Sequence, residues 1–339
     1  MKLVVTGGAG FIGSNFVHRT LAAHADWTVL VLDKLTYAGN LKNLESALAS
    51  DRCQFVQMDI CDPGVGEVLR GCDAVVHFAA ESHVDRSIED ATAFVRTNIE
   101  GTFKLIQASR AAAVPRFIHV STDEVYGSLG EDGEFTEESP LQPNSPYAAS
   151  KAASDLLVLA YVRTHNFPAI VTRCSNNYGP YQFPEKFIPL MIAQASEGKR
   201  LPVYGNGTNV RDWLHVSDHC DAIEVVLLQG RCGEVYNIGG GCEMRNLEVA
   251  RLILKKFELP ETQVEFVKDR PGHDLRYAIN CDKLSRETGW HAQIGFEDGL
   301  AQTIDWYRDN RAWLNDVRSG TYREYFERHY LQRDRTFAG

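Results

Sequence analysis

Several features that would assign a chain to a simple class are missing from this sequence. The eight cysteines among its 339 residues include no CxxC pair, so the spacing favours neither a zinc ribbon nor a thioredoxin-like site. No uninterrupted apolar run reaches the ~20 residues of a membrane helix, and a strand predicted to start almost at once leaves no room for a signal peptide. We therefore expect free, mostly buried thiols, a cytoplasmic protein and no membrane partner.

An excess of positive charge is also missing. The formal net charge is -10, and nucleic acids and anionic membrane surfaces repel a chain of that sign at long range. Neither is expected as the main partner, and a phosphate-bearing ligand would need a local basic cluster. There is no repeat or low-complexity segment, and 44% hydrophobic with 24% charged residues is a globular composition, long enough for two lobes.

The first half of the chain alternates short β-branched runs with helical patterns, which is typical of a parallel sheet with helices on both faces. The predicted strands are Leu3–Thr6, Thr28–Asp33, Gln54–Asp59, Ala74–Phe78, Arg116–Ser121 and Ala169–Arg173. Helices are expected to begin near Phe11, Ala91 and Tyr147. The pattern predicts an α/β fold with a six-stranded, doubly wound (Rossmann) sheet, whose ligand crevice lies at the carboxyl ends of the strands.

Glycine and proline become frequent after Arg173 and the predicted elements shorten, which indicates a smaller C-terminal α/β lobe. We expect residues 1–173 and 212–240 to form the Rossmann domain, and residues 174–211 and 241–339 to form the second lobe. A last amphipathic helix, from Phe296 to Trp313, is expected to pack on the core.

A glycine-rich turn follows the first strand and opens a helix. Gly7, Gly10 and Gly13 let a pyrophosphate approach the backbone, and the helix start offers unpaired N–H groups to the anion. Asp33 ends the second strand about 20 residues further on, where a carboxylate accepts from an adenosine ribose and repels a 2′-phosphate. Lys34 is a cation that would suit such a phosphate, but Asp33 opposes it, and NAD is favoured over NADP.

Two further strand ends fit the same cofactor. Asp59 and Ile60 follow the third strand, where the adenine is expected. Phe78, Ala79 and Ala80 end the fourth strand, and the two alanines leave room for the cofactor to pass. Either strand end alone could be an ordinary one, but their order along the chain after the glycine turn and Asp33 supports a dinucleotide site.

Tyr147 and Lys151 are four residues apart on a predicted helix and therefore share one face. A tyrosine acts as a base near neutral pH only if its phenolate is stabilised, which a lysine one turn away and a cationic nicotinamide would do. Thr122, Asp123 and Glu124 follow the fifth strand, so a hydroxyl and two carboxyl groups are expected beside Tyr147. The alternative for this acidic pair is a solvated turn.

Together these groups suit an elimination without net oxidation. Tyr147 would take the proton of a secondary alcohol as its hydride leaves, which makes the hydrogen on the neighbouring carbon acidic. One carboxylate would remove that hydrogen, a protonated carboxyl group would help a β-hydroxyl leave as water, and the hydride would then return. Two carboxyl groups are needed because one must be ionised while the other is protonated.

Longer stretches carry a resemblance to a known family. They are residues 33–40 (DKLTYAGN), 79–87 (AAESHVDRS), 175–181 (SNNYGPY), 211–213 (RDW) and 269–274 (DRPGHD). With the glycine turn, Thr122-Asp123-Glu124 and the YxxxK pair, they resemble the dTDP-glucose 4,6-dehydratases of the extended short-chain dehydrogenase/reductase family over nearly the whole chain. The resemblance implies an NAD-dependent hydro-lyase that makes dTDP-4-keto-6-deoxyglucose for rhamnose-type or antibiotic deoxysugars, and a homodimer formed through two long helices.

The resemblance also implies roles for individual residues. Tyr147 would be the base at the C4 hydroxyl, supported by Lys151, with Thr122 bonded to the C4 oxygen. Glu124 would be the base at C5 and Asp123 the acid for the C6 hydroxyl. Further cofactor contacts would come from Phe11, Ile12, Leu35, Thr36, Ser82, Thr97 and Asn177. The nucleotide sugar, held largely by the second lobe, would contact Ser82, Thr122, Asn176, Lys186, Phe187, Pro202, Val203, Tyr204, Arg211, Asn246, Asp269, Arg270, Pro271, Gly272 and His273.

Guanidinium groups match phosphate oxygens in a fork, so Arg211 and Arg270 suit the diphosphate of such a substrate. The alternative for Arg211 is a surface ion pair with its neighbour Asp212. His215 and His219 have helical spacing that would allow metal binding, but no third ligand is evident, and no metal is expected.

Three other functions stay open at this point. A nucleotide-sugar 4-epimerase would use the same NAD site, tyrosine and lysine, but it would leave Asp123 and Glu124 unexplained. A dehydratase acting on a UDP-sugar would use the same chemistry as one acting on a dTDP-sugar. A non-catalytic NAD-binding scaffold would explain none of the catalytic set.

Overall fold

A computed structural model describes residues 1–318; residues 319–339, the end of the expected second lobe, lie outside the described residues. The largest element is a parallel sheet of seven strands in the order β10-β6-β5-β4-β1-β2-β3. These strands are β1 (Lys2–Thr6), β2 (Thr28–Asp33), β3 (Cys53–Gln57), β4 (Ala74–His77), β5 (Phe117–Thr122), β6 (Ala169–Cys174) and β10 (Val235–Ile238). The order reverses between β1 and β4, which is where a doubly wound sheet opens its ligand crevice.

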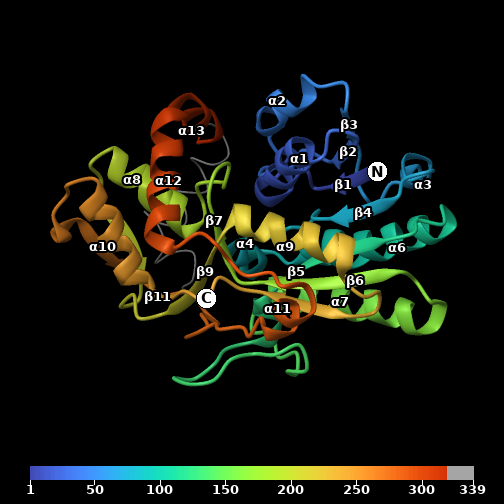
Figure 1. Cartoon of the computed structure of the whole chain (residues 1–339). Coiled ribbons are helices and arrows are strands. Elements are labelled where there is room, and N and C mark those ends of the chain that lie inside the picture. Colours follow the sequence, from blue (N-terminus) through green and yellow to red (C-terminus); the bar gives the residue numbers. More distant parts are fainter. Residues whose placement is uncertain (319–339) are drawn as a thin grey trace.

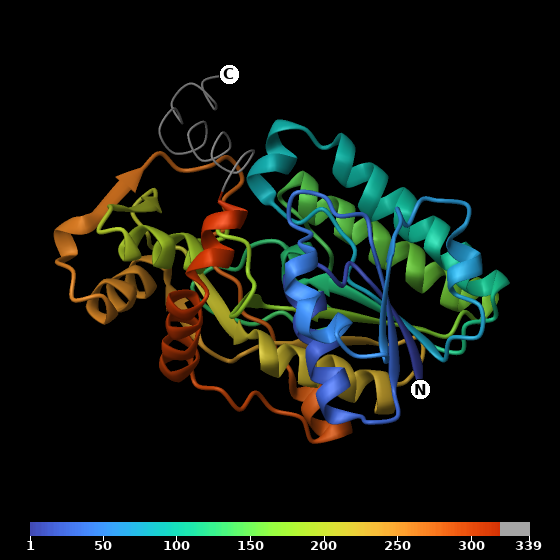
Figure 2. The ribbon, with the colours of Figure 1, turned by 90° about the horizontal axis from the view of Figure 1, so that it is seen from above.

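Helices cover both faces of this sheet (Figure 2). α1 (Phe11–Ala23) and α9 (Val216–Gln229) pack together on one face, and α6 (Thr102–Ala111) and α7 (Pro146–His165) pack together on the other. Because water reaches neither face, the strands are apolar along most of their length, and Val4 and Val5 are fully buried. The Rossmann-type α/β fold predicted from the sequence is confirmed.

Shorter elements form a smaller group at one side of the large sheet (Figure 1). They include a three-stranded sheet in the order β11-β9-β7 and a two-stranded sheet of β12 and β8. The strands are β7 (Asn176–Tyr178), β8 (Leu201–Tyr204), β9 (Val210–His215), β11 (Glu243–Arg245) and β12 (Val264–Val267). Three helices, α8 (Phe187–Ser196), α10 (Asn246–Lys256) and α12 (Phe296–Asp309), bury Met191, Ile253 and Leu300 in a common apolar cluster.

The structure differs from the sequence-based expectation in three places. The sheet has a seventh strand, β10, whose four residues are too few to show a period. The helix expected near Ala91 consists of α5 (Thr92–Phe94), a π-helical segment η2 (Val95–Gly101) and α6. The last helix, expected to reach Trp313, ends at Asp309, and a second helix, α13 (Arg311–Val317), follows Asn310.

The remaining elements are short. They are η1 (Leu41–Leu44), α2 (Glu45–Leu48), α3 (Val65–Val68), α4 (Val84–Glu89), η3 (Asp123–Tyr126), η4 (Glu261–Gln263) and α11 (Asp282–Thr288). α4 and η3 each follow a strand of the large sheet, β4 and β5 respectively, so their residues lie at the crevice.

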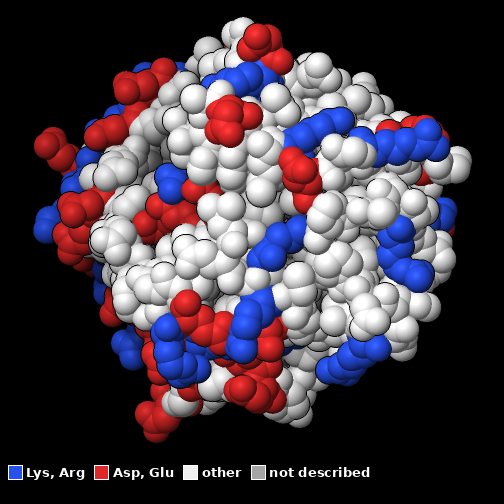
Figure 3. Space-filling model, turned by 45° about the vertical axis from the view of Figure 1, so that its right-hand side comes forward, with Lys and Arg blue, Asp and Glu red and all other residues white. Residues whose placement is uncertain are grey.

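The surface carries both signs of charge. Figure 3 shows acidic and basic side chains scattered among uncharged ones on the face that it presents. No helix among residues 1–318 is long and apolar enough to cross a membrane. All eight cysteines are free thiols, of which Cys53, Cys72, Cys174 and Cys220 are buried while Cys232 is exposed.

Candidate active site

The glycine turn between β1 and α1 lies close to the backbone that follows β4, and its own backbone packs tightly on itself. Gly7 has a φ of +71°, and a Cβ there would lie 2.5 Å from the amide nitrogen of Ala79. A Cβ at Gly13 would collide with the carbonyl oxygen of Gly7. No side chain caps the start of α1, so its first N–H groups face the crevice. The turn therefore fits a pyrophosphate, as the sequence predicts.

Asp33 is held in place at the end of β2. Its carboxylate accepts hydrogen bonds from the N–H groups of Ala9, at 3.0 Å, and Leu35, at 2.8 Å. Burial raises the pKa of Asp33, and these backbone bonds oppose the rise. Lys34 does not approach Asp33 as a partner; its ammonium pairs with Asp59 at 2.8 Å. The cation that complicated the choice between NAD and NADP is therefore engaged by a second carboxylate.

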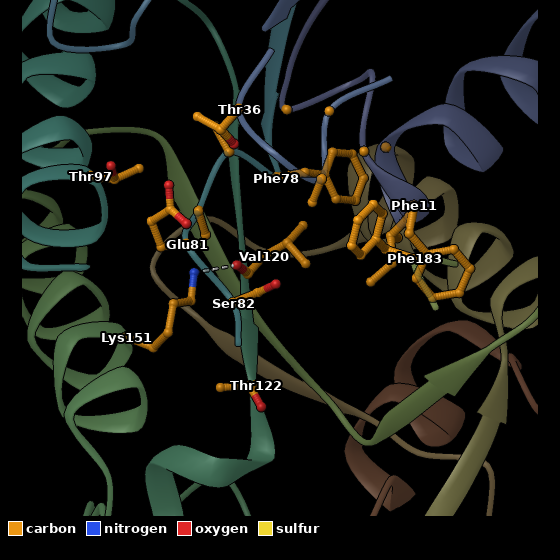
Figure 4. A pocket seen from close by; sticks show the side chains of 18 of the residues that line it. Phe11, Thr36, Phe78, Glu81, Ser82, Thr97, Val120, Thr122, Lys151 and Phe183 are labelled. Carbon is orange, nitrogen blue, oxygen red and sulfur yellow. Dashed lines mark hydrogen bonds between the residues drawn. The ribbon is translucent and has the colours of Figure 1, made fainter. Parts of the chain in front are cut away.

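One cavity at the carboxyl ends of the strands collects nearly all of the predicted cofactor residues (Figure 4). Its lining includes Gly7, Gly10, Phe11, Ile12, Gly13, Asp33, Lys34, Thr36, Asp59, Ile60, Phe78, Ala79, Ala80, Ser82, Thr97, Tyr147, Lys151 and Asn177. Leu35 is the exception: it turns the chain with a φ of +57° and packs against the apolar core.

Helix α7 supplies the tyrosine and the lysine. Its start is defined by Ser145, whose side chain accepts from the N–H of Ala148, and by Pro146 in the first turn. Tyr147 and Lys151 then follow on one face, both buried. The Lys151 ammonium donates to the Val120 carbonyl of β5 at 2.8 Å, and Figure 4 shows the side chain crossing to that strand.

The surroundings shift the pKa values of both Tyr147 and Lys151. Burial, and next the charge of Glu124, raise the pKa of the Tyr147 phenol well above its usual value. Burial lowers the pKa of Lys151 to about 8, although the charge of Asp155 opposes the fall. A cationic ligand beside the phenol would work in the opposite direction to Glu124, because it favours the phenolate.

The acidic pair lies where the sequence predicts it, directly after β5. Thr122 caps the short helix η3 by accepting from the N–H of Glu124 at 3.2 Å. Its hydroxyl also donates to Asp123 Oδ1 at 3.3 Å, whereas the buried Oδ2 has no hydrogen-bond partner among the described residues. The unpartnered oxygen belongs to a residue that lines the cavity, together with Glu124 and Tyr147.

The two carboxyl groups have different electrostatic surroundings. Burial, followed by the charges of Glu124 and Asp212, raises the pKa of Asp123 well above its usual value. Burial also raises the pKa of Glu124, but Arg270, Lys186 and Arg211 oppose it. The pKa of both carboxyl groups is raised, and that of Asp123 is raised further, so a single proton on the pair favours Asp123. This is the division that acid and base catalysis by neighbouring carboxyl groups needs.

A second cavity adjoins the first, since Glu124, Asn176 and Lys186 line both. The predicted substrate residues on its wall are Asn176, Lys186, Phe187, Pro202, Tyr204, Arg211, Asn246, Arg270 and His273. Ser82 and Thr122 line the first cavity. Four others do not line either: Val203 is fully buried in β8, Asp269 bonds to His273, and Pro271 and Gly272 are exposed.

The two arginines, Arg211 buried and Arg270 partly buried, lie beside acidic or aromatic groups. Arg211 donates to the Asp274 carbonyl at 3.0 Å and lies 4.4 Å from the centre of the Tyr277 ring. It does not form the surface ion pair with Asp212 considered above, because Asp212 accepts instead from the N–H groups of Gly240 and Cys242. Arg270 pairs with Asp85 at 3.2 Å.

Sequence reasoning missed several residues that line the two cavities. They include Glu81, Val120, Ser121, Cys174, Ser175, Gln182, Phe183 and Glu185 in the first, and His83, Asp85, Leu190, Met191 and Trp213 in the second. Glu81, His83 and Asp85 fall within the 79–87 stretch. That stretch was part of the family resemblance, but these three residues were not predicted individually as site residues.

His215 and His219 have structural partners. His215 caps α9 by accepting from the N–H of Ser217, and His219 bonds to the side chain of Asn177 at 2.9 Å. Within residues 1–318 no three His, Cys, Asp or Glu side chains gather closely enough to hold a metal ion.

Comparison with known proteins agrees with this geometry. The family model described as GDP-mannose 4,6 dehydratase matches residues 4–303. A dTDP-glucose 4,6-dehydratase from Streptomyces niveus is 55% identical, covering 94% of this chain and 96% of its own. The solved dTDP-glucose 4,6-dehydratase of Streptomyces venezuelae, with NAD bound, is 54% identical with a TM-score of 0.91, covering 94% of this chain and 100% of its own.

Epimerases share the fold at lower identity. The UDP-glucuronic acid 4-epimerase of Bacillus cereus, in complex with UDP-glucuronic acid and NAD, is 29% identical with a TM-score of 0.86, covering 91% of this chain and 99% of its own. The dehydratases are thus much nearer in sequence than this epimerase, at almost the same overall fold. The chain belongs to the nucleotide-sugar 4,6-dehydratases and, within them, to the dTDP-glucose 4,6-dehydratase family.

Proposed function

We propose that this enzyme uses NAD to convert dTDP-glucose into dTDP-4-keto-6-deoxyglucose, an intermediate suited to rhamnose-type or antibiotic deoxysugars. The observation that carries the proposal is the pair Asp123 and Glu124 on one short helical turn, beside Tyr147, with the pKa of Asp123 raised further than that of Glu124. An oxidation alone needs the tyrosine but not two carboxyl groups.

The first step is oxidation at C4. NAD, when bound, would supply the acceptor for the C4 hydride and, after water has left, the donor of that hydride to C6 as C5 regains a proton. Tyr147 takes the proton of the C4 hydroxyl, Thr122 bonds to the C4 oxygen, and Lys151 contributes the positive charge that favours the Tyr147 phenolate. The cofactor cradle is the glycine turn with Asp33, whose close backbone contacts fit a dinucleotide.

The second step is loss of water across C5 and C6. Glu124 removes the C5 proton, which the C4 ketone has made acidic, and Asp123 gives its proton to the C6 hydroxyl as that group leaves. Burial and neighbouring negative charge keep Asp123 protonated, and three nearby cations favour the ionised form of Glu124.

The nucleotide sugar binds in the second cavity and its rim. Its contacts in this proposal are Ser82, Thr122, Asn176, Lys186, Phe187, Pro202 to Tyr204, Arg211, Asn246 and Asp269 to His273. Arg211 and Arg270 meet the diphosphate, because they are guanidinium groups that line this cavity. Residues 1–173 and 212–240 serve as the NAD-binding domain, and residues 174–211 and 241–339 as the nucleotide-sugar lobe.

The assembly and the compartment are also part of the proposal. We infer a homodimer in the cytoplasm, formed through the helical stretch after Ala91 and through α7. Two apolar side chains support this surface: Val95 is 53% exposed and Leu156 is 57% exposed, on η2 and α7 respectively.

The deciding experiment is mass spectrometry of dTDP-glucose after incubation with the enzyme and NAD in deuterated water. We expect a product that has lost one water and carries deuterium at C5. A product of unchanged mass with inverted C4 would make the enzyme a 4-epimerase. Turnover of UDP-glucose in preference to dTDP-glucose would overturn the nucleotide assignment alone.

A further inference from the structure

Asp85 is a buried carboxylate that the proposed chemistry does not use. It lies on α4, directly after the crevice end of β4, and only 1% of its surface is exposed. It nevertheless lines the second cavity, where the nucleotide sugar is proposed to bind. A buried charge needs strong partners, so its contacts indicate what it is for.

Each of its two oxygens meets a proposed substrate residue. Oδ2 accepts from the hydroxyl of Tyr204 at 2.7 Å, and Oδ1 pairs with Nη1 of Arg270 at 3.2 Å. Tyr204 ends β8, and Arg270 lies in the loop after β12, so the partners come from the two-stranded sheet of the smaller group and from the loop that leaves it. Asp85 comes from the other side of the cavity and joins residues that are 119 and 185 positions away.

The same short segment makes other contacts across the cavity. The Ser82 carbonyl accepts from Lys186 at 2.6 Å, and the Arg86 guanidinium pairs with Glu185 at 3.1 Å. Lys186 also lines both cavities. Residues 82–86 therefore hold the opposite wall in place, and Asp85 is the member that reaches the arginine.

The pairing leaves most of the Arg270 guanidinium available. Asp85 takes one N–H of Nη1, and Nε of Arg270 is buried without a hydrogen-bond partner among residues 1–318. A guanidinium has five N–H donors in a planar fork, so one edge can be anchored while another meets phosphate oxygens. Fixing a flexible arginine before the ligand arrives removes part of the ordering cost of binding.

We propose that Asp85 is a positioning residue for the diphosphate of the nucleotide sugar, which it serves by fixing Arg270 and Tyr204 before substrate binds. The inference rests on the proposed function, since it requires Arg270 to meet the diphosphate. It touches neither the reacting atoms nor the cofactor. Its effect belongs to substrate affinity rather than to the chemical steps.

The test is a double-mutant cycle in the NAD-loaded enzyme. Calorimetry measures the Kd for dTDP in four proteins: wild type, Asp85→Asn, Arg270→Ala and the double variant. Turnover of dTDP-glucose gives KM and kcat for the same proteins. Glu89→Gln, which removes an exposed carboxylate from the same helix, is the matched control.

We expect Asp85→Asn to raise the Kd for dTDP and the KM about 10- to 100-fold, as loss of a charge-assisted hydrogen bond does, with kcat within about threefold. In the Arg270→Ala background the same change should cost at most the roughly threefold to tenfold that loss of the Tyr204 bond alone would give, because the part that acts through Arg270 is already gone. Equal costs in both backgrounds, an unchanged Kd, or a fall confined to kcat would each overturn the positioning role.

Failure of the proposed function gives a different result. If wild type does not dehydrate dTDP-glucose, the activity is wrong, yet the dTDP cycle still decides the role of Asp85. If Asp85→Asn lowers the yield of folded protein, Tyr204→Phe removes only the hydroxyl bond and should raise the Kd about threefold to tenfold. An unchanged Kd in that variant contradicts the proposal.

Discussion

Asp123 and Glu124 are neighbours in the chain, but the protein surrounds them with different sets of charges. When two carboxyl groups lie close together, the negative charge of one disfavours ionisation of the other, which raises the pKa. The difference comes from Lys186 and Arg270, which oppose the rise for Glu124, while the charge of Asp212 adds to it for Asp123; Arg211 opposes the rise for both. None of these groups is adjacent to the pair in the sequence, so the division of roles arises only in the folded chain.

Separate substitutions should therefore stop different steps. Asp123→Asn removes the acid, and we expect kcat to fall about 100- to 10,000-fold, while NADH, seen by its near-ultraviolet absorbance, still forms in a single turnover. Glu124→Gln should also form NADH but should abolish deuterium exchange at C5. Asp132→Asn, at an exposed carboxylate, is the control. Normal turnover in both active-site variants would contradict the assigned roles.

Lys151 should make cofactor binding depend on pH. Its pKa is lowered to about 8, so the charged fraction is high at pH 7 and falls as the pH rises through 8. Because the charged ammonium is the stronger donor to a ribose hydroxyl, we expect the apoenzyme to bind NAD about 5- to 10-fold more weakly at pH 9 than at pH 7. Fluorescence titration measures this. Lys151→Met should bind NAD more weakly than wild type, and its NAD affinity should show no change near pH 8. A change near pH 8 that persists in this variant would belong to another group.

At the scale of elements, the π-helical segment η2 positions the loop after β4. Asn98, buried within η2, accepts from the N–H of Glu81 and donates to the Glu81 carbonyl and to Ser150 of α7. One amide thus joins three elements that border the cofactor cavity. π-Helical segments often occur at functional sites, where the extra residue per turn redirects a side chain.

We expect Asn98→Ala to lower both stability and NAD affinity, because it leaves two backbone groups of Glu81 without partners in a partly buried loop. The expected cost is about 1–3 kcal/mol in stability. Thermal unfolding with and without NAD measures both effects. Asn98→Asp keeps the acceptor but loses the donors, so its stability should fall between those of wild type and Asn98→Ala. If Asn98→Ala were as stable as wild type, η2 would not support the loop.

The elements that sequence patterns predicted are those with a clear period or boundary. The strands through β6 were predicted to within two residues, since each is a short run that contains β-branched residues. η2 has no period of its own, and β10 is only four residues long. The break at Asn310 was missed because the apolar spacing continues across it to Trp313 and Leu314, both buried.

At the scale of the whole molecule, the cofactor site was far more predictable than the substrate site. The former is assembled from strand ends, which share one edge of a sheet by topology alone. The latter depends on pairs such as Asp85 with Arg270, separated by 185 residues, which no local pattern reveals. The family resemblance supplied most of the residues of that wall, but not the carboxylate that holds them.

The proposed dimer predicts a change in molecular mass. Leu156→Glu places a charge in the middle of the exposed apolar part of α7, and we expect a monomer by light scattering after size exclusion. Leu228→Glu, on α9 at the opposite face of the sheet, is a matched control because Leu228 is also exposed, at 46%. A dimer that persists in the first variant, or is lost in the second, would place the interface elsewhere.

The ion pair between Lys34 and Asp59 has a consequence for the evolution of cofactor choice. An ammonium next to Asp33 suggests that one substitution, Asp33 to a neutral residue, would open the site to NADP. Yet the lysine is already held by Asp59, so the released space would carry no available cation until Asp59 changed as well. We therefore expect the two substitutions to depend on each other, with a change at Asp33 alone giving a smaller gain in NADP affinity than changes at Asp33 and Asp59 together.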